Sequence, residues 1–205
     1  MEPAPQRSRK CPECEQRIVV RTQRGTGGKQ LLTVEEAARL DAQRKAKAAR
    51  NKALRRIEWL GVTDRDFDVR ERQLAEQWGT DPHPGDVFWS IANEKITALS
   101  SEGQWHELSM LYQQMGAHLL DEGKPHRRLQ QQAHEAELRH LATLSEWEPE
   151  GRRRAVILAN ACCDACEQLD GQVFTFEEAM DAIPLPPEVC EREWCNCLWS
   201  ATYLD

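Results

Sequence analysis

The sequence lacks any apolar stretch long enough to cross a membrane. No hydrophobic run approaches the roughly 20 residues that a bilayer-spanning helix needs, and the first residues lack the apolar core of a secretory signal. We therefore expect a cytoplasmic protein without a membrane segment. Because thiols in a reducing cytosol persist as metal ligands or buried residues rather than as disulfides, the eight cysteines favour metal binding.

The sequence also has few of the patterns that mark enzymes. Residues 25–29 resemble a phosphate-binding loop, but Gln23 and Gln30 stand where that motif needs glycine and a hydroxyl residue. His134 is not followed by the second histidine of a zinc-protease helix, because Leu138 occupies that position. No set of nucleophile, base and orienting group emerges, so we expect a protein that is not an enzyme.

The net charge of −7 conceals a strong asymmetry. Residues 1–60 hold 15 Lys and Arg against 7 Asp and Glu, a balance of +8, whereas residues 61–205 hold 12 against 27, a balance of −15. A basic end of this kind suits a polyanion, an acidic partner protein, or the acidic remainder of the same fold. Charge alone does not choose among them.

A basic helix is predicted over residues 34–61. Thr33 and Glu36 form a capping box at its start, and Gly61 is a residue type that ends helices. Between residues 41 and 53 its only apolar side chains are alanines, so little of it can enter a core. Nucleic-acid binding through phosphate contacts is one interpretation; a solvated helix or an intramolecular partner is the other. The candidate phosphate-binding residues are Arg39, Arg44, Lys45, Lys47, Arg50, Lys52, Arg55 and Arg56.

Residues 62–150 have the periodicity of packed helices. Thr63 and Asp66 form a second capping pair, and apolar residues recur at helical spacing through residues 84–147. The stretch 111–124, with small residues and a Gly-containing turn, resembles a tetratricopeptide unit. This resemblance covers about one repeat and a half, so we expect helical hairpins that are only partly tetratricopeptide-like.

The cysteines near the C-terminus predict a structural zinc site. Cys163-x-x-Cys166 can occupy one edge of a zinc tetrahedron, and two of Cys190, Cys195 and Cys197 would complete it, with Cys190 and Cys195 favoured. Four thiolates leave no position for a reactive water, so Zn²⁺ would hold the fold together.

The residues around this motif predict a small α+β module. A strand is expected over 155–159, leading into Cys163-x-x-Cys166 as a strand-turn-strand, with Cys162 as a buried bystander. A redox pair would instead need the motif to open a helix of a thioredoxin-like unit. Asp170-Gly171 predicts a two-residue hairpin, and Thr175 begins a short helix.

Part of this tail resembles the zinc-binding C-terminal segment of Mu-type phage head morphogenesis proteins. The resemblance rests on Cys163-Asp-Ala-Cys166, residues 169–174, the proline-rich residues 184–187 and Cys195-Asn-Cys197, about 40 residues in all. That family has a histidine before its final cysteines, whereas Cys190 stands in that region here. The resemblance implies zinc binding and a phage or prophage origin. The whole chain is also similar to uncharacterised bacterial and phage proteins with a zinc-ribbon-like start, helices and such a tail.

A second cysteine pair lies near the N-terminus. Cys11-x-x-Cys14, followed by a predicted hairpin, is similar to half of a zinc ribbon. The other half is missing, so the pair is a relic, is completed by another chain or by a remote cysteine such as Cys162 or Cys197, or follows a gene start placed too late.

The sequence thus predicts a mainly α protein in four parts. These are a partial zinc-ribbon-like hairpin (1–33), the basic helix (34–61), a helical domain (62–150) and a zinc-binding α+β module (151–205). We expect a non-enzymatic, zinc-stabilised adaptor that binds another protein. The alternatives are a nucleic-acid-binding protein and a phage structural protein.

Overall fold

The computed structural model describes residues 8–10, 17–22, 28–145, 153–160, 163–182 and 185–203. The protein is mainly helical, with small antiparallel sheets, as the sequence predicts. The chain divides into two compact units, Met1–Ala53 (unit 1) and Leu54–Asp205 (unit 2). Within the described ranges, no helix is long and apolar enough to cross a membrane.

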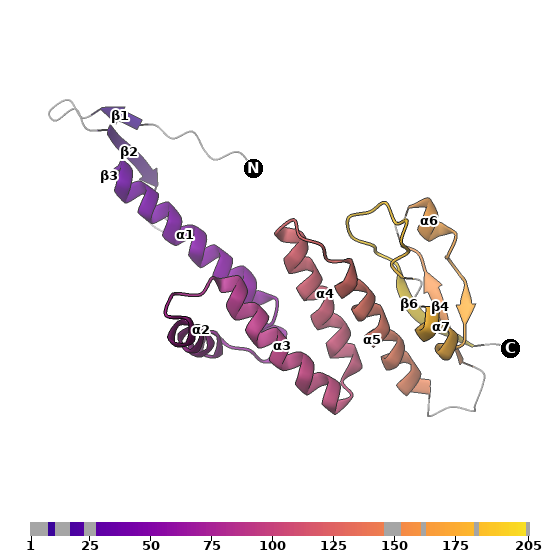
Figure 1. Ribbon diagram of the computed structural model, residues 1–205. Helices are drawn as coiled ribbons and strands as arrows, with labels where there is room; N and C mark the ends of the chain where they lie inside the picture. The colour runs from indigo at the N-terminus through magenta and orange to yellow at the C-terminus, as the bar shows by residue number, and fades with distance from the viewer. Residues whose placement is uncertain are drawn as a thin grey trace. The chain divides into compact units, whose positions relative to one another are not determined.

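Unit 1 begins with a three-stranded antiparallel sheet (Figure 1). The predicted hairpin is present as β2 (Arg17–Thr22) and β3 (Lys29–Thr33), and a strand that the sequence did not suggest, β1 (Ser8–Lys10), pairs with β2. Val19 and Leu32 face each other across the hairpin and pack with Ala37 and Leu40. This small cluster joins the sheet to the helix that follows.

Helix α1 (Val34–Arg55) begins at the predicted capping box. The Thr33 N–H donates to the Glu36 carboxylate at 2.9 Å, and the Glu36 N–H donates to the Thr33 hydroxyl at 3.2 Å. The helix ends at Arg55, earlier than expected, because Ile57 departs from helical geometry (φ −127°) and becomes fully buried. A 3₁₀ turn, η1 (Glu58–Leu60), follows and ends at Gly61 (φ +76°).

Unit 2 contains four longer helices, each packed on the next (Figure 1). They are α2 (Asp64–Trp78), α3 (Pro84–Glu102), α4 (Trp105–Asp121) and α5 (Arg127–Ser145). The capping box that the sequence predicts at Thr63 is present. The antiparallel α4–α5 pair is a helical hairpin, and the closer likeness to a tetratricopeptide unit stays a prediction. The buried side chains of the helices α2, α3 and α4 include Phe67, Val87, Phe88, Ile91, Leu108, Leu111 and Met115.

The C-terminal part of unit 2 is a small sheet with two short helices. Strands β5 (Val173–Phe174), β4 (Arg153–Leu158) and β6 (Leu198–Tyr203) are antiparallel in that order. Helices α6 (Asp164–Glu167) and α7 (Phe176–Ala182) lie between the strands in sequence, and α5 packs on β4, β6 and α7. Four buried cysteines, Cys166, Cys190, Cys195 and Cys197, lie in the core beneath this sheet.

The C-x-x-C motif has a strand on either side, as expected: Cys163 is the N-cap residue of the one-turn helix α6, which lies between the paired antiparallel strands β4 and β5. One local expectation for the tail is wrong. Asp170-Gly171 does not close a two-residue hairpin, because the partner of β5 is β4, which ends at Leu158 before α6 begins. Gly171 (φ +71°) instead donates its N–H to the Ile157 carbonyl at 2.9 Å.

Candidate metal centre

The first pair of cysteines is presented by the turn after β4. Cys163 is the residue before α6, and the N–H of Cys166 donates to the Cys163 carbonyl at 2.9 Å, which closes a tight knuckle. The Asp170 carboxylate accepts a hydrogen bond from the N–H of Ala159 at 2.8 Å. These contacts place both sulfurs on the core side of the turn, with Cys166 buried and Cys163 half-buried.

The other cysteines lie on the segment 185–197, which Arg127 fixes from the start of α5. The Arg127 guanidinium donates to the carbonyls of Pro187 (3.0 Å), Glu188 (3.1 Å) and Cys190. One side chain therefore satisfies three main-chain acceptors around the residue that presents the Cys190 sulfur. A hydrogen bond from a charged donor contributes more to stability than a bond between two neutral groups.

Four further contacts hold the part of this segment from Glu193 to Cys195. The Gln130 amide donates to the Cys195 carbonyl at 3.5 Å, and a ring nitrogen of His126 lies 2.6 Å from the Glu193 carbonyl. Trp194 stacks on the His126 ring at a centroid distance of 5.6 Å. The same indole covers Gly116 of α4, where an added Cβ would stand 3.0 Å from its Cη2 atom.

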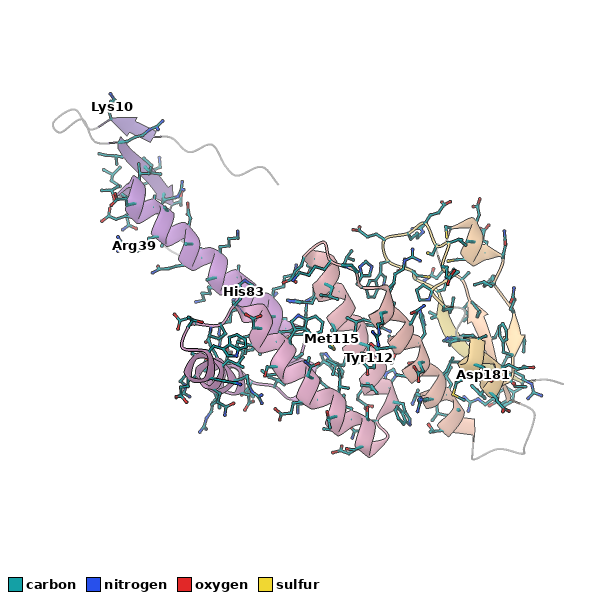
Figure 2. All side chains as sticks on the ribbon, in the orientation of Figure 1. Lys10, Arg39, His83, Tyr112, Met115 and Asp181 are labelled. Carbon is teal, nitrogen blue, oxygen red and sulfur yellow. The ribbon has the colours of Figure 1, made fainter. Side chains whose placement is uncertain are left out.

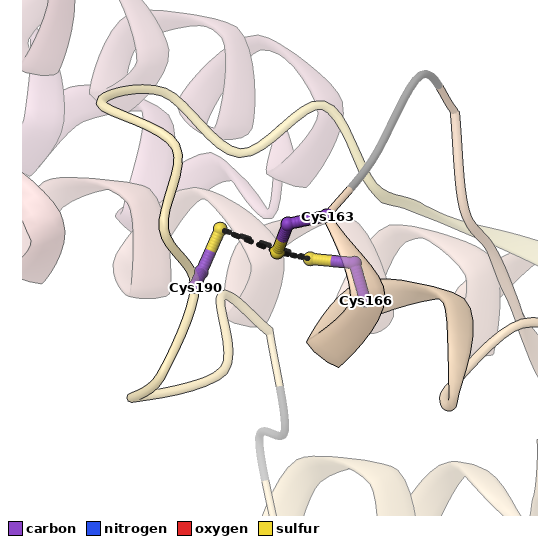
Figure 3. A group of neighbouring side chains, drawn as sticks. All are labelled: Cys163, Cys166 and Cys190. Atoms are coloured by element: carbon purple, nitrogen blue, oxygen red, sulfur yellow. Dashed lines mark hydrogen bonds between the residues drawn. The ribbon is translucent and has the colours of Figure 1, made fainter.

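Three sulfurs from these two segments form a triangle (Figure 3). The Sγ atoms of Cys163 and Cys190 are 3.8 Å apart, and each lies 3.7 Å from Cys166 Sγ. Four sulfurs bound at roughly 2.3 Å to one tetrahedral zinc ion stand roughly 3.8 Å from one another. The three measured edges therefore have the length of a tetrahedral thiolate site.

A second group shares one sulfur with the first. The Cys195 Sγ lies 3.7 Å from Cys166 Sγ, and Cys166, Cys195 and Cys197 form a group whose sulfurs all lie within 4.8 Å of one another. Both groups have the spacing to hold a metal ion. All five cysteines predicted in this tail are thus brought together, and Cys166 is common to both groups.

The protein shifts the pKa values of these thiols in opposite directions. The backbone N–H groups of Glu191 and Cys166 lower the pKa of Cys163 to about 7. Burial raises the pKa of Cys166 and Cys195 to about 12 and that of Cys197 to about 11. Without a metal the buried sulfurs stay protonated, so a bound cation would have to displace their protons.

A cavity of about 210 Å³ lies beside the second group. Gln130, His134 and Asn196 line it together with Cys195 and Cys197. Burial lowers the pKa of His134 to about 4, so its ring is neutral at pH 7. A neutral imidazole and three amides, those of Gln113, Gln130 and Asn196, make this a polar but uncharged space next to the sulfurs.

The redox interpretation of the C-x-x-C motif gains no support from the helix at its end. α6 is a single turn, and β4 and β5, the strands that flank it in sequence, are antiparallel, unlike a parallel βαβ unit. Cys166 also lies as close to Cys190 as to Cys163. Such a site matches metal coordination better than an isolated dithiol.

The structure describes all eight basic residues that the sequence predicts as phosphate contacts. Arg39, Lys45, Lys47 and Arg55 are exposed, and Arg39 is seen on the first part of α1 in Figure 2. Arg44 donates to the Thr22 carbonyl at 3.3 Å, and both Arg50 and Lys52 have partners of their own. Arg56, in the turn after α1, contacts α4, where its guanidinium pairs with Asp121 and donates to the Gln114 and Ala117 carbonyls. The Arg56 guanidinium is therefore already bonded within unit 2.

Three predicted cysteines, Cys11, Cys14 and Cys162, lie outside the described residues. The sequence reasoning missed the residues that position the site. Arg127 did leave a signal, because a helix start favours acidic side chains whereas α5 begins with Arg127-Arg128 and has no acid in its first turn. Gln130 and Trp194 left none, since their partners lie far away in sequence.

No protein-family model matches the chain, and neither curated proteins nor solved structures show a significant match. The resemblance of the tail to phage head morphogenesis proteins therefore stays a prediction. A proposal about function therefore rests on the geometry of the cysteines and on the charge distribution.

Proposed function

We propose that this protein is a non-enzymatic interaction protein whose C-terminal part is stabilised by zinc. The observation that carries the proposal is the spacing of the sulfurs of Cys163, Cys166 and Cys190, 3.7 to 3.8 Å on every edge. Thiolates are soft ligands that suit Zn²⁺, and a tetrahedral thiolate site has this edge length.

The surroundings of the sulfurs support a structural role for the ion. Cys166, Cys190, Cys195 and Cys197 belong to the same buried cluster as Ile157 and Trp199, so the ion would lie inside a core. Metal binding would then add its free energy to the folding of this small three-stranded sheet.

The surface that supports an interaction role is the basic helix α1. No residue from Ala38 to Lys52 is buried, although the whole stretch is helical. Unit 1 holds 13 Lys and Arg against 6 Asp and Glu, a balance of +7, whereas unit 2 holds 14 against 28, a balance of −14. A helix that packs so little of its surface and carries this charge suits an acidic partner protein.

Nucleic acid is the second candidate partner, because exposed Lys and Arg lie at several positions around α1. Phosphate contacts would make such binding steeply dependent on salt and nearly independent of base sequence. Arg56 is left out of this surface, since its guanidinium pairs with Asp121.

Metal analysis tests the structural part of the proposal. Full-length protein purified without added metal is expected to carry zinc, and chelation is expected to lower its melting temperature. A metal-free protein that melts at the same temperature with and without chelator would contradict the structural role.

Charge neutralisation tests the choice of partner. Lys45, Lys47 and Arg55 are replaced by Gln, and Arg65, Arg72 and Arg128, which are exposed residues of unit 2, serve as the matched control set. If α1 binds nucleic acid, duplex DNA or RNA binding falls at least tenfold in the first variant only, with a smaller salt slope. Absence of binding by the unaltered protein at low salt would leave an acidic protein as the partner class.

A further inference from the structure

The geometry points to a centre of two metal ions bridged by the sulfur of Cys166, an inference that rests on the proposed metal-binding role and deepens it. One ion would bind Cys163, Cys166 and Cys190, and the other would bind Cys166, Cys195 and Cys197. The ligand class is thiophilic divalent cations such as Zn²⁺ and Cd²⁺.

The grouping of the sulfurs carries this inference. In a mononuclear tetrahedral site, four sulfurs lie roughly 3.8 Å from one another and form one group. Among the residues that the structure describes, the cysteines form two groups of three that share one member, and no group has four. A single ion at the first triangle would leave two further sulfurs, those of Cys195 and Cys197, outside its group.

Cys166 has the position of a bridging ligand. Its sulfur lies 3.7 Å from each of three others, those of Cys163, Cys190 and Cys195, and its residue is 1 % exposed. A thiolate sulfur has more than one lone pair, so it can bind two soft cations at once. The buried location protects such a bridge from competing water.

The net charge also favours two ions. Five thiolates with two divalent cations carry a charge of −1, whereas four thiolates with one cation carry −2 and leave a fifth buried sulfur unused. Since uncompensated charge in a core is costly, the smaller net charge is the more stable arrangement.

Each ion then has one coordination position that no thiolate of its group fills. Beside Cys195 and Cys197, the cavity of about 210 Å³ has room for a water molecule as a ligand, next to Gln130, His134 and Asn196. At the first group, Cys163 is half-buried, so the corresponding position is near solvent.

Metal stoichiometry in the full-length chain tests the bridge. Cys11→Ser and Cys14→Ser are introduced together so that the N-terminal pair contributes no ligand. The metal-free protein is titrated with Zn²⁺ and followed by native mass spectrometry, and in parallel with ¹¹³Cd²⁺ and followed by NMR. We expect two ions per chain and two cadmium resonances that are coupled to each other through the shared sulfur.

Single substitutions separate the two positions. In the same background, Cys163→Ser and Cys197→Ser are each expected to keep one ion, and Cys166→Ser is expected to lose both or to fail to fold. One ion per chain, unchanged by Cys197→Ser, would overturn the bridge while leaving the proposed structural zinc intact. No bound ion at all would overturn both.

Discussion

Units 1 and 2 are held together in different ways. In unit 1, helix α1 has no buried residue from Ala38 to Lys52, so it depends on its alanine-rich sequence, on the cap at Thr33, and on contacts of Asp41 and Arg44 with the sheet. In the tail of unit 2, the contacts that hold the cysteine-bearing segment join residues up to 67 positions apart in sequence. The difference teaches that local signals suffice for the start of α1, whereas long-range contacts decide the tail of unit 2.

The largest effect that separates the two units is expected from Cys166→Ser. This substitution removes the sulfur that both cysteine groups share, so metal binding is lost and unit 2 is destabilised by roughly 5 kcal/mol or more. The helical signal of α1 should be retained, because its cap at Thr33 and its alanine-rich sequence are local to that helix. Metal analysis measures the loss of the ion, and chemical denaturation followed by circular dichroism measures the loss of stability and the retained helical signal. Unchanged metal content in this variant would show that the ion binds elsewhere.

Arg127→Gln is expected to have the next largest effect. It leaves the carbonyls of Pro187, Glu188 and Cys190 without their charged donor, which costs about 2–3 kcal/mol. Because the segment that carries Cys190 is then less well positioned, metal affinity should fall roughly 10- to 100-fold. Isothermal titration calorimetry with Zn²⁺ measures the change in metal affinity.

Arg128→Gln is the matched control, since this residue is exposed on the same helix turn and has the same charge. An equal loss of affinity in both variants would indicate a general charge effect rather than positioning by Arg127.

Gly116→Ala tests the contact between α4 and the cysteine-bearing segment. The new Cβ would stand 3.0 Å from the Trp194 ring, so stability is expected to fall by about 1–2 kcal/mol. In a Trp194→Leu background the same substitution should cost much less. Urea denaturation of the four proteins measures the coupling, and additive effects would mean that Trp194 does not lie on Gly116.

Thiol reactivity should differ within the cluster of the metal-free protein. Because backbone N–H groups lower the pKa of Cys163 to about 7 while burial raises that of Cys166 to about 12, Cys163 should be alkylated at least about tenfold faster at pH 7.5. Its rate should rise with pH through about 7, as the thiolate forms. Peptide mass spectrometry after timed iodoacetamide treatment measures this, and equal rates would contradict the described environments.

The smallest effect is expected from Ala46→Gly on α1. Glycine at this exposed helical position costs about 1 kcal/mol of local helix stability. Metal affinity should not change, because the helix position is local to unit 1. Amide hydrogen exchange along α1 measures the loss, and a parallel fall in metal affinity would show that the two units are coupled.

The sequence predicted the parts of the fold that local chemistry determines. The capping boxes at Thr33, Thr63 and Thr175 all form, and the last of them begins α7 as expected. The hairpin predicted at Asp170-Gly171 does not form, because a turn signal does not tell which strand β5 pairs with. The partner of β5 is β4, and helix α6 lies between the two strands in sequence.

The cysteine site shows the same limit. Its members could be predicted, since Cys163, Cys166 and Cys190 have metal-ligand spacing and lie together as expected. The sequence favours Cys195 over Cys197, whereas the structure brings both to Cys166. The sequence could not indicate Trp194 as a structural residue, because its contact with Gly116 joins positions that only the folded chain brings together.

The most direct test of the account is the metal content of the full-length chain carrying Cys11→Ser and Cys14→Ser. The account predicts that this protein still binds zinc, and that chelation removes the ion and lowers the melting temperature of unit 2. A protein with no bound metal, whose melting temperature and thiol reactivity are the same with and without zinc, would contradict it.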